Sequence, residues 1–293
     1  VSFMSLAAMT ACTEKIILVA TSHVLYGPWH PLHFAKFCAT LDHISKGRWG
    51  INVVTGHRAV EHEMFGWHRI EHDRRYELAS EFLDAVQQLW AQPDNFSFAP
   101  PLSSWRLDKA FVTPKPQYGR PLLVNATGSD AGIEFAARYS DVVFITSPAG
   151  SEIEAALAAL PAHTARVKAT AAKYGRKIRT LINPMVICRE TAAEALAYRD
   201  AIVAHGDEGS FHRFESDAHA WRGNSEQRNQ AAARAVGGNI SIVGSPQQIA
   251  DYIVRLHRAG IDGVQLSFFD FQPDLEFFGA HVLPLLREAG LRY

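Results

Sequence analysis

The stretch at residues 49–76, WGINVVTGHRAVEHEMFGWHRIEHDRRY, carries the strongest fold signal in this chain. Its opening residues, Trp49–Val54, alternate as a strand does, with the polar Asn52 on one face and apolar neighbours on the other. The strand leads into a loop dense in His, Glu and Arg, and an amphipathic helix begins at Asp73. Because α/β proteins bind ligands at the carboxyl ends of parallel strands, we expect a ligand site in this loop.

Strands and helices alternate along the rest of the chain. Apolar runs predict strands at residues 16–21, 49–54, 122–126, 142–146, 180–188 and 263–268. Helical patterns follow at residues 31–45, 73–90, 128–139, 151–174, 191–205, 246–259 and 273–289, a further helix at 3–13 has no strand before it, and a small hairpin is predicted near 96–111. Such alternation indicates a parallel sheet wound by right-handed crossovers.

Two α/β architectures fit this pattern, an open doubly wound sheet and a closed barrel. No strand end carries the GxGxxG turn of a doubly wound nucleotide fold, so we favour a TIM-type (β/α)8 barrel. The barrel is expected to form one domain over residues 1–293, with an insertion near 206–238. Since six strands are visible where a barrel needs eight, we expect its N-terminal strands to be missing. A preceding segment of about 60 residues or a partner chain would then complete the wall.

Composition excludes several classes of protein. The chain has 293 residues, is 47% hydrophobic and has a formal net charge of −1, which argues for a large core and against binding to nucleic acid or anionic membranes. No apolar run approaches the length of a membrane span and no leader pattern opens the chain. The three widely spaced cysteines, Cys12, Cys38 and Cys188, are interpreted as buried thiols. A cytoplasmic protein is therefore predicted.

Six residues at four places in the chain stand where predicted strands carry polar groups or give way to helices. Asn52 and Thr21 lie in or at the end of predicted strands, so each either bonds a neighbouring side chain or faces a ligand. Gly128 and Ser129 stand where a strand gives way to a helix, where free amides and the helix dipole favour an anion, although Ser129 could equally be an N-cap. The Arg75-Tyr76 pair opens another helix, where a basic side chain is unfavourable unless it contacts an anion.

Histidine is the most conspicuous residue type, with 14 copies in the chain. A zinc-hydrolase hypothesis would use them as ligands, but no HExxH or HxH pair is present, so we expect no metal. Most of these histidines are interpreted as surface or capping residues. His23 and His57 directly follow strand ends and are the candidates for a general acid or base.

Several motifs together resemble a known family. They are GPWHP (27–31), AKFCATLDHISKGRWGINVVTG (35–56), EHDRRY (71–76), PKPQYGRPLLVNATGSDAG (114–132) and LSFFDFQPDLEFFGAHVLPLL (266–286). Taken over nearly the whole chain, they are similar to the bacterial luciferase-like flavin monooxygenases. Within that superfamily they resemble the two-component branch that contains alkanesulfonate, dimethylsulfone and pyrimidine monooxygenases.

The resemblance implies a cofactor and a site. It implies a flavin-binding barrel in which Asn52 contacts the FMN ring system and Glu61 lies in the loop over it. Arg75 and Tyr76 would approach the ribityl chain. The phosphate would be held by Ser129 and the amide edge of Gly128, with Thr21 also on the cofactor side.

The resemblance also implies a reaction. Reduced FMN and O2 would oxidise a small organosulfur substrate, a sulfone or an alkanesulfonate, through a flavin peroxide. Two kinds of protein partner are expected, an NAD(P)H-dependent flavin reductase and further copies of the chain in a homo-oligomer. The alternatives are a pyrimidine ring-cleaving monooxygenase, a deazaflavin-dependent oxidoreductase on the same barrel, and a flavin-binding subunit without turnover.

Overall fold

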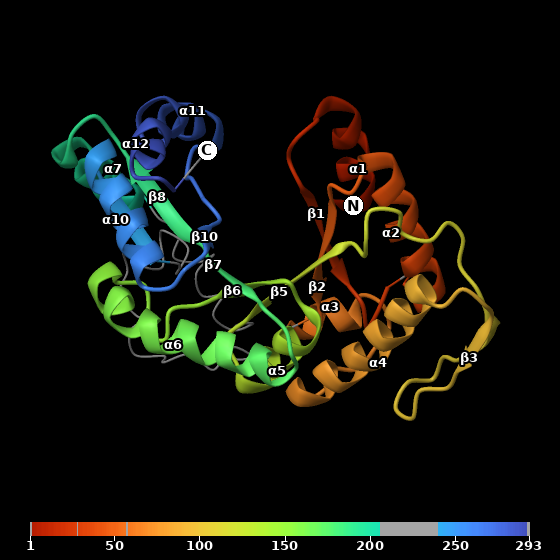
Figure 1. Ribbon diagram of the computed structural model, residues 1–293. Coiled ribbons are helices and arrows are strands. Elements are labelled where there is room, and N and C mark those ends of the chain that lie inside the picture. Colours follow the sequence, from red (N-terminus) through yellow and green to blue (C-terminus); the bar gives the residue numbers. More distant parts are fainter. Residues whose placement is uncertain (1, 28, 57, 206–239, 292–293) are drawn as a thin grey trace. The chain divides into compact units, whose positions relative to one another are not determined.

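The computed structural model describes residues 2–27, 29–56, 58–205 and 240–291. They belong to two compact units, Val1–Val142 and Val143–Tyr293, each built from parallel strands and helices (Figure 1). No helix within the described ranges is both long and apolar enough to cross a membrane. The expected insertion near 206–238 lies outside the described residues, and the single barrel domain stays a prediction.

The N-terminal unit holds three neighbouring parallel strands of a sheet, in the order β1-β2-β5. Its elements are α1 (Ser2–Cys12), β1 (Leu18–His23), α2 (Pro31–Ser45), β2 (Trp49–Val54), α3 (Ala59–Glu63), α4 (His72–Ala91), β3 (Phe96–Phe98), β4 (Leu107–Ala110), β5 (Leu122–Thr127) and α5 (Asp130–Tyr139). Thr21 of β1 pairs with Asn52 of β2, which pairs with Val124 of β5. Because the strands are parallel and in register, their carboxyl ends lie along one edge of the sheet.

One face of this sheet carries the hydrophobic core. Leu18, Ile51 and Leu123, one from each strand, belong to a buried cluster that includes Phe34 of α2 and Phe82 of α4. Helices α2 and α4 lie side by side (Figure 1), and the indole nitrogen of Trp90 donates to the carbonyl of Ala35 at 2.9 Å. With this face buried against helices, alternation places Asn52 on the opposite face.

The long helices of the unit begin where sequence signals predict. Helix α2 has Pro31 in its first turn and ends at Lys46, whose φ of 56° is left-handed. The carboxylate of Glu71 caps α4 by accepting from the amides of Asp73 and Arg74 at 2.9 and 3.0 Å. The predicted helices at 31–45 and 73–90 are therefore confirmed to within a residue, and so is the small hairpin, formed by β3 and β4. Helix α3 was not predicted.

The C-terminal unit contains parallel strand pairs covered by helices. Its elements are β6 (Val142–Ile145) at the boundary, α6 (Ile153–Lys173), β7 (Arg179–Ile182), β8 (Pro184–Cys188), α7 (Ala192–Ala204), β9 (Ile240–Gly244), α10 (Pro246–Arg258), β10 (Gly263–Val264), α11 (Phe271–His281) and α12 (Leu283–Glu288). Strand β7 pairs with β10, and β8 pairs with β9.

Four sequence-based expectations need correction, three of them in this unit. The strand predicted at 180–188 is interrupted at Asn183, and the helix predicted at 273–289 is divided at Val282. Strand β9 was missed because it follows a segment without periodicity. Among the cysteines, Cys38 and Cys188 are buried as expected, but Cys12 is exposed, since it ends α1 on the solvent side.

Candidate active site

All described residues of the predicted site lie in the N-terminal unit, at or near the carboxyl ends of β1, β2 and β5. Thr21 and Asn52 are register partners on neighbouring strands. The Oδ1 atom of Asn52 is buried, and no hydrogen-bond donor reaches it among the residues that the structure describes. A buried amide oxygen without a donor is costly, so this atom is suited to accept from a bound ligand.

Glu61 and His23 are brought together, as a shared site requires. Glu61 lies in α3, where its Oε2 atom accepts from the backbone amide of Arg58 at 3.3 Å and from the hydroxyl of Tyr26 at 3.3 Å. Its Oε1 atom lies 3.8 Å from Nε2 of His23. That distance is too long for a direct hydrogen bond but allows an ion pair when the imidazole is protonated.

Tyr26 was not predicted and stands at the centre of this group. It is buried, and burial, followed by the charge and hydrogen bond of Glu61, raises the pKa of the phenol above its ordinary value. The hydroxyl therefore keeps its proton and donates. Gly56 makes room for it: its φ is +75°, and a Cβ at this position would stand 2.4 Å from the Tyr26 oxygen. A larger residue at position 56 would displace the phenol.

His62 adds a second unpredicted buried group. Its ring lies 4.6 Å from that of Tyr26, only 1% of the residue is exposed, and neither ring nitrogen has a hydrogen-bond partner among the described residues. Burial, and next the charge of Arg75, lower the pKa of His62. The imidazole is therefore neutral at pH 7.

Arg75 carries the buried positive charge of the site. It is 5% exposed, its Nε atom lacks a hydrogen-bond partner among the described residues, and burial lowers the pKa of its guanidinium. It also stands in the first turn of α4, where the helix dipole disfavours a cation. An anionic or strongly polar ligand would offset both costs.

The end of β5 forms a cradle at the start of α5. Ser129 caps this helix, since its Oγ atom accepts from the amide of Gly132 at 3.2 Å. A Cβ at Gly132 would stand 1.7 Å from Oγ1 of Thr127 and 2.7 Å from the hydroxyl of Tyr76. The Thr127 hydroxyl is itself buried without a partner among the described residues. The two interpretations of Ser129 are compatible, because capping uses its hydroxyl whereas an anion at a helix start binds backbone amides.

These features fit the FMN that the family resemblance implies. Asn52 offers an acceptor for a ring N–H, Arg75 offers a charged donor, and the α5 start offers amides to a phosphate. These roles stay predictions. His57, the other catalytic candidate, lies outside the described residues.

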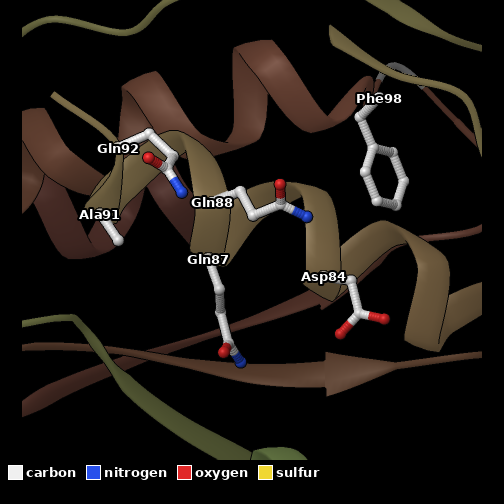
Figure 2. A pocket seen from close by; sticks show the side chains of 6 residues that line it. All are labelled: Asp84, Gln87, Gln88, Ala91, Gln92 and Phe98. Atoms are coloured by element: carbon white, nitrogen blue, oxygen red, sulfur yellow. The ribbon is translucent and has the colours of Figure 1, made fainter. Parts of the chain in front are cut away.

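Within the described part of the chain, no group of three or more His, Cys, Asp or Glu side chains could hold a metal ion. Figure 2 shows a pocket farther along α4, and it shares no residue with the candidate site. It is lined by Asp84, Gln87, Gln88, Ala91, Gln92 and Phe98.

Sequence reasoning missed Tyr26, His62, Thr127 and Gly132 because their importance depends on contacts. Tyr26 and Glu61 are 35 positions apart, and no local pattern pairs them. The GxxxxEH spacing after β2 was visible, but which of its side chains turns inward was not. The signals available in the sequence were Tyr26, shortly after β1, and Gly56, shortly after β2.

Comparison with known proteins assigns the family. The chain is 34% identical over 290 residues to an FMNH2-dependent dimethylsulfone monooxygenase of Pseudomonas fluorescens (strain Pf0-1), covering 96% of this chain and 76% of that protein. It is 30% identical to the pyrimidine monooxygenase RutA of Acinetobacter baylyi, covering 97% and 77%. The crystal structure of the long-chain alkane monooxygenase LadA superposes with a TM-score of 0.85 at 24% identity, covering 99% and 74%.

These similarities confirm the expected luciferase-like TIM-barrel class and the expected enzyme class, a flavin-dependent monooxygenase. The sequence profile described as luciferase-like monooxygenase matches residues 2–263, which is most of the chain. The chain belongs to the luciferase-like monooxygenase family.

Proposed function

We propose that this protein uses reduced FMN and O2 to oxidise a small organosulfur compound, a sulfone or an alkanesulfonate. The observation that carries the proposal is the 34% identity over 96% of the chain to a protein named an FMNH2-dependent dimethylsulfone monooxygenase. One oxygen atom goes to the substrate and the other to water, while the reduced flavin and the substrate each give up two electrons. Bound reduced FMN supplies the electrons that activate O2.

The residues of the N-terminal unit have separate tasks in this proposal. Asn52 accepts a hydrogen bond from the flavin ring system through its Oδ1 atom, which has no donor among the described residues, and Arg75 and Tyr76 bind along the ribityl chain. The amides of Gly128 and Ser129 hold the phosphate. Thr21, beside Asn52 on the same sheet face, limits where the ring can lie.

The other side of the site handles protons and water. His23 is placed to exchange a proton with the reacting groups, and the nearby Glu61 carboxylate stabilises the imidazolium that results. The buried rings of Tyr26 and His62 exclude water from this edge of the sheet. Exclusion of water matters because an activated oxygen species in water is lost without reaching the substrate. His57 is the second acid or base candidate.

Two partners belong to the proposal. A separate NAD(P)H-dependent reductase supplies the reduced flavin, as the wording "FMNH2-dependent" in the name of the dimethylsulfone enzyme suggests. A homo-oligomer is the second. Both can be tested by adding reductase in trans and by measuring the mass of the assembly in solution.

Isotope labelling tests the reaction directly. The full chain is incubated with FMN, a flavin reductase, NADH and 18O2, together with dimethylsulfone, an alkanesulfonate or uracil, and the products are analysed by mass spectrometry. We expect one labelled oxygen atom in the product of a sulfone or sulfonate. Label in a uracil product alone would support the pyrimidine alternative, which the 30% identity to RutA favours next. Oxygen-independent turnover with a deazaflavin would contradict both.

A further inference from the structure

The phenol of Tyr26 is the point where four separate segments of the site meet. Its ring centroid lies 5.0 Å from that of His23 in β1, 4.6 Å from that of His62 in α3 and 5.6 Å from that of Phe65 beyond α3. The fourth segment is the turn after β2, where Gly56 approaches the hydroxyl so closely that a Cβ would stand 2.4 Å from it. The ring contacts and the approach of Gly56 together fix the position of the hydroxyl.

We propose that Tyr26 is a positioning residue of this site, whose hydroxyl holds the Glu61 carboxylate and thereby keeps α3 folded beside His23. The inference deepens the proposed function and rests on it, since Glu61 and His23 are the side chains that Tyr26 would position. The hydroxyl donates to Oε2 of Glu61 at 3.3 Å, while Oε1 of the same carboxylate lies 3.8 Å from Nε2 of His23.

Helix α3 needs such an anchor because it is short. It spans Ala59–Glu63, and a single helical turn in isolation is unstable in water. Glu61 closes its first turn by accepting from the Arg58 amide at 3.3 Å, a contact within the helix start itself. The Tyr26 hydroxyl instead comes from 35 positions earlier in the chain, so it fastens α3 to the end of β1.

The direction of this hydrogen bond is also settled. Burial and the neighbouring Glu61 charge raise the pKa of Tyr26, so the phenol stays protonated across the range in which enzymes work. Glu61 therefore accepts a hydrogen bond from a neutral donor whose position is fixed. A phenylalanine at position 26 would keep the ring contacts and remove only this donor.

Amide hydrogen exchange of the full chain without flavin tests the anchor independently of turnover. We expect Tyr26→Phe to speed amide exchange at residues 59–65 about tenfold. In the variant, α3 can open without breaking a hydrogen bond to the Tyr26 hydroxyl, so it opens more often. Glu61→Ala should speed exchange similarly. The matched control is Tyr139→Phe, which removes another buried phenol hydroxyl. That hydroxyl donates to Oδ1 of Asp84 over 2.9 Å, and neither residue belongs to the candidate site. Equal exchange in Tyr26→Phe and wild type would overturn the inference.

A double-mutant cycle then tests the link to the site. At saturating reduced flavin, Tyr26→Phe should lower the product formed per flavin oxidised about tenfold with unchanged affinity for FMN, and adding it to Glu61→Ala should cause no further loss. Independent, multiplying losses would show that Tyr26 does not act through Glu61. If wild type forms no labelled product with any substrate of the panel, the proposed function fails, and the exchange rates still decide the role of Tyr26.

Discussion

The two polar regions of the candidate site are built differently. At the ends of β1 and β2, the buried side chains of Tyr26, His62 and Arg75 and the half-buried Glu61 come from segments far apart in the sequence and depend on one another for position. At the end of β5, the start of α5 is formed by neighbouring residues, with Ser129 as cap. Substitutions in the first region should therefore be coupled, while those in the second should act locally.

Gly132 is an exception, because it lies in the second region but stands close to Tyr76, the neighbour of Arg75. A substitution at Gly132 should have the largest effect on stability. Gly132→Ala places a Cβ 1.7 Å from Oγ1 of Thr127 and 2.7 Å from the hydroxyl of Tyr76, which belongs to α4. We expect a loss of about 3 kcal/mol in the free energy of unfolding, near the upper end for overpacking. Denaturant unfolding measures it. Gly279→Ala in α11, where a Cβ would meet nothing within 4 Å, is the control and should not destabilise. Equal stability of both variants would contradict the close packing at Gly132.

Replacing Arg75 should change FMN affinity and the stability of the flavin-free protein in different ways. Arg75→Met should lower FMN affinity about 10- to 100-fold, as expected for a lost charged hydrogen bond of roughly 1.5–3 kcal/mol. The flavin-free variant should be as stable as wild type or more so, because an apolar chain replaces a buried guanidinium whose Nε has no partner in the part of the chain that the structure describes.

Fluorescence titration with FMN and thermal unfolding without it measure the two effects of Arg75→Met. Arg138→Met, which removes a half-exposed guanidinium paired with Asp84, should leave FMN affinity unchanged. Unaltered affinity in Arg75→Met would remove Arg75 from the site.

His62 makes the first region sensitive to pH. Because its pKa is lowered from 6.5 in the folded state, the unfolded state binds more protons between the two pKa values, and stability rises with pH there. We expect the stability that depends on neutral His62 to be fully present above about pH 7 and to be lost as the pH falls below about 6.5. The slope of stability against pH from this group is at most ~1.4 kcal/mol per pH unit.

His62→Gln should remove the contribution of His62 to the pH dependence of the melting temperature, so the melting temperature should fall less steeply as the pH is lowered. Burial also lowers the pKa of His30 and His163, and both stay in the variant, so the difference between the two proteins isolates His62. Identical pH profiles would mean that His62 titrates as in the unfolded chain.

Ser129 gives the smallest expected effect and sharpens the contrast with Arg75. Ser129→Ala should cost about 1 kcal/mol of stability as a lost cap, and about 1 kcal/mol of FMN binding. Thr191→Ala is a matched control, because Thr191 caps α7 through the same 3.2 Å contact to the third amide of its helix. It should lose stability without losing FMN affinity. Equal FMN affinity in both variants would restrict Ser129 to capping.

The contrast between the regions also explains what could be predicted from the sequence. Helix α2 and the start of α5 follow from local chemistry, a proline in the first turn and a serine cap, and both were predicted correctly. The contact between Tyr26 and Glu61 is non-local, so only the fold could reveal it. Strand β9 was missed for a different reason, since no periodic segment precedes it.

The central claim is that reduced flavin binds at the carboxyl ends of β1, β2 and β5, and a crystal structure of the full chain with FMN tests it most directly. We expect a flavin atom within about 3 Å of Oδ1 of Asn52, a contact from Arg75 to the cofactor, and the phosphate at the start of α5. FMN bound elsewhere, with Oδ1 of Asn52 still without a donor, would contradict the account.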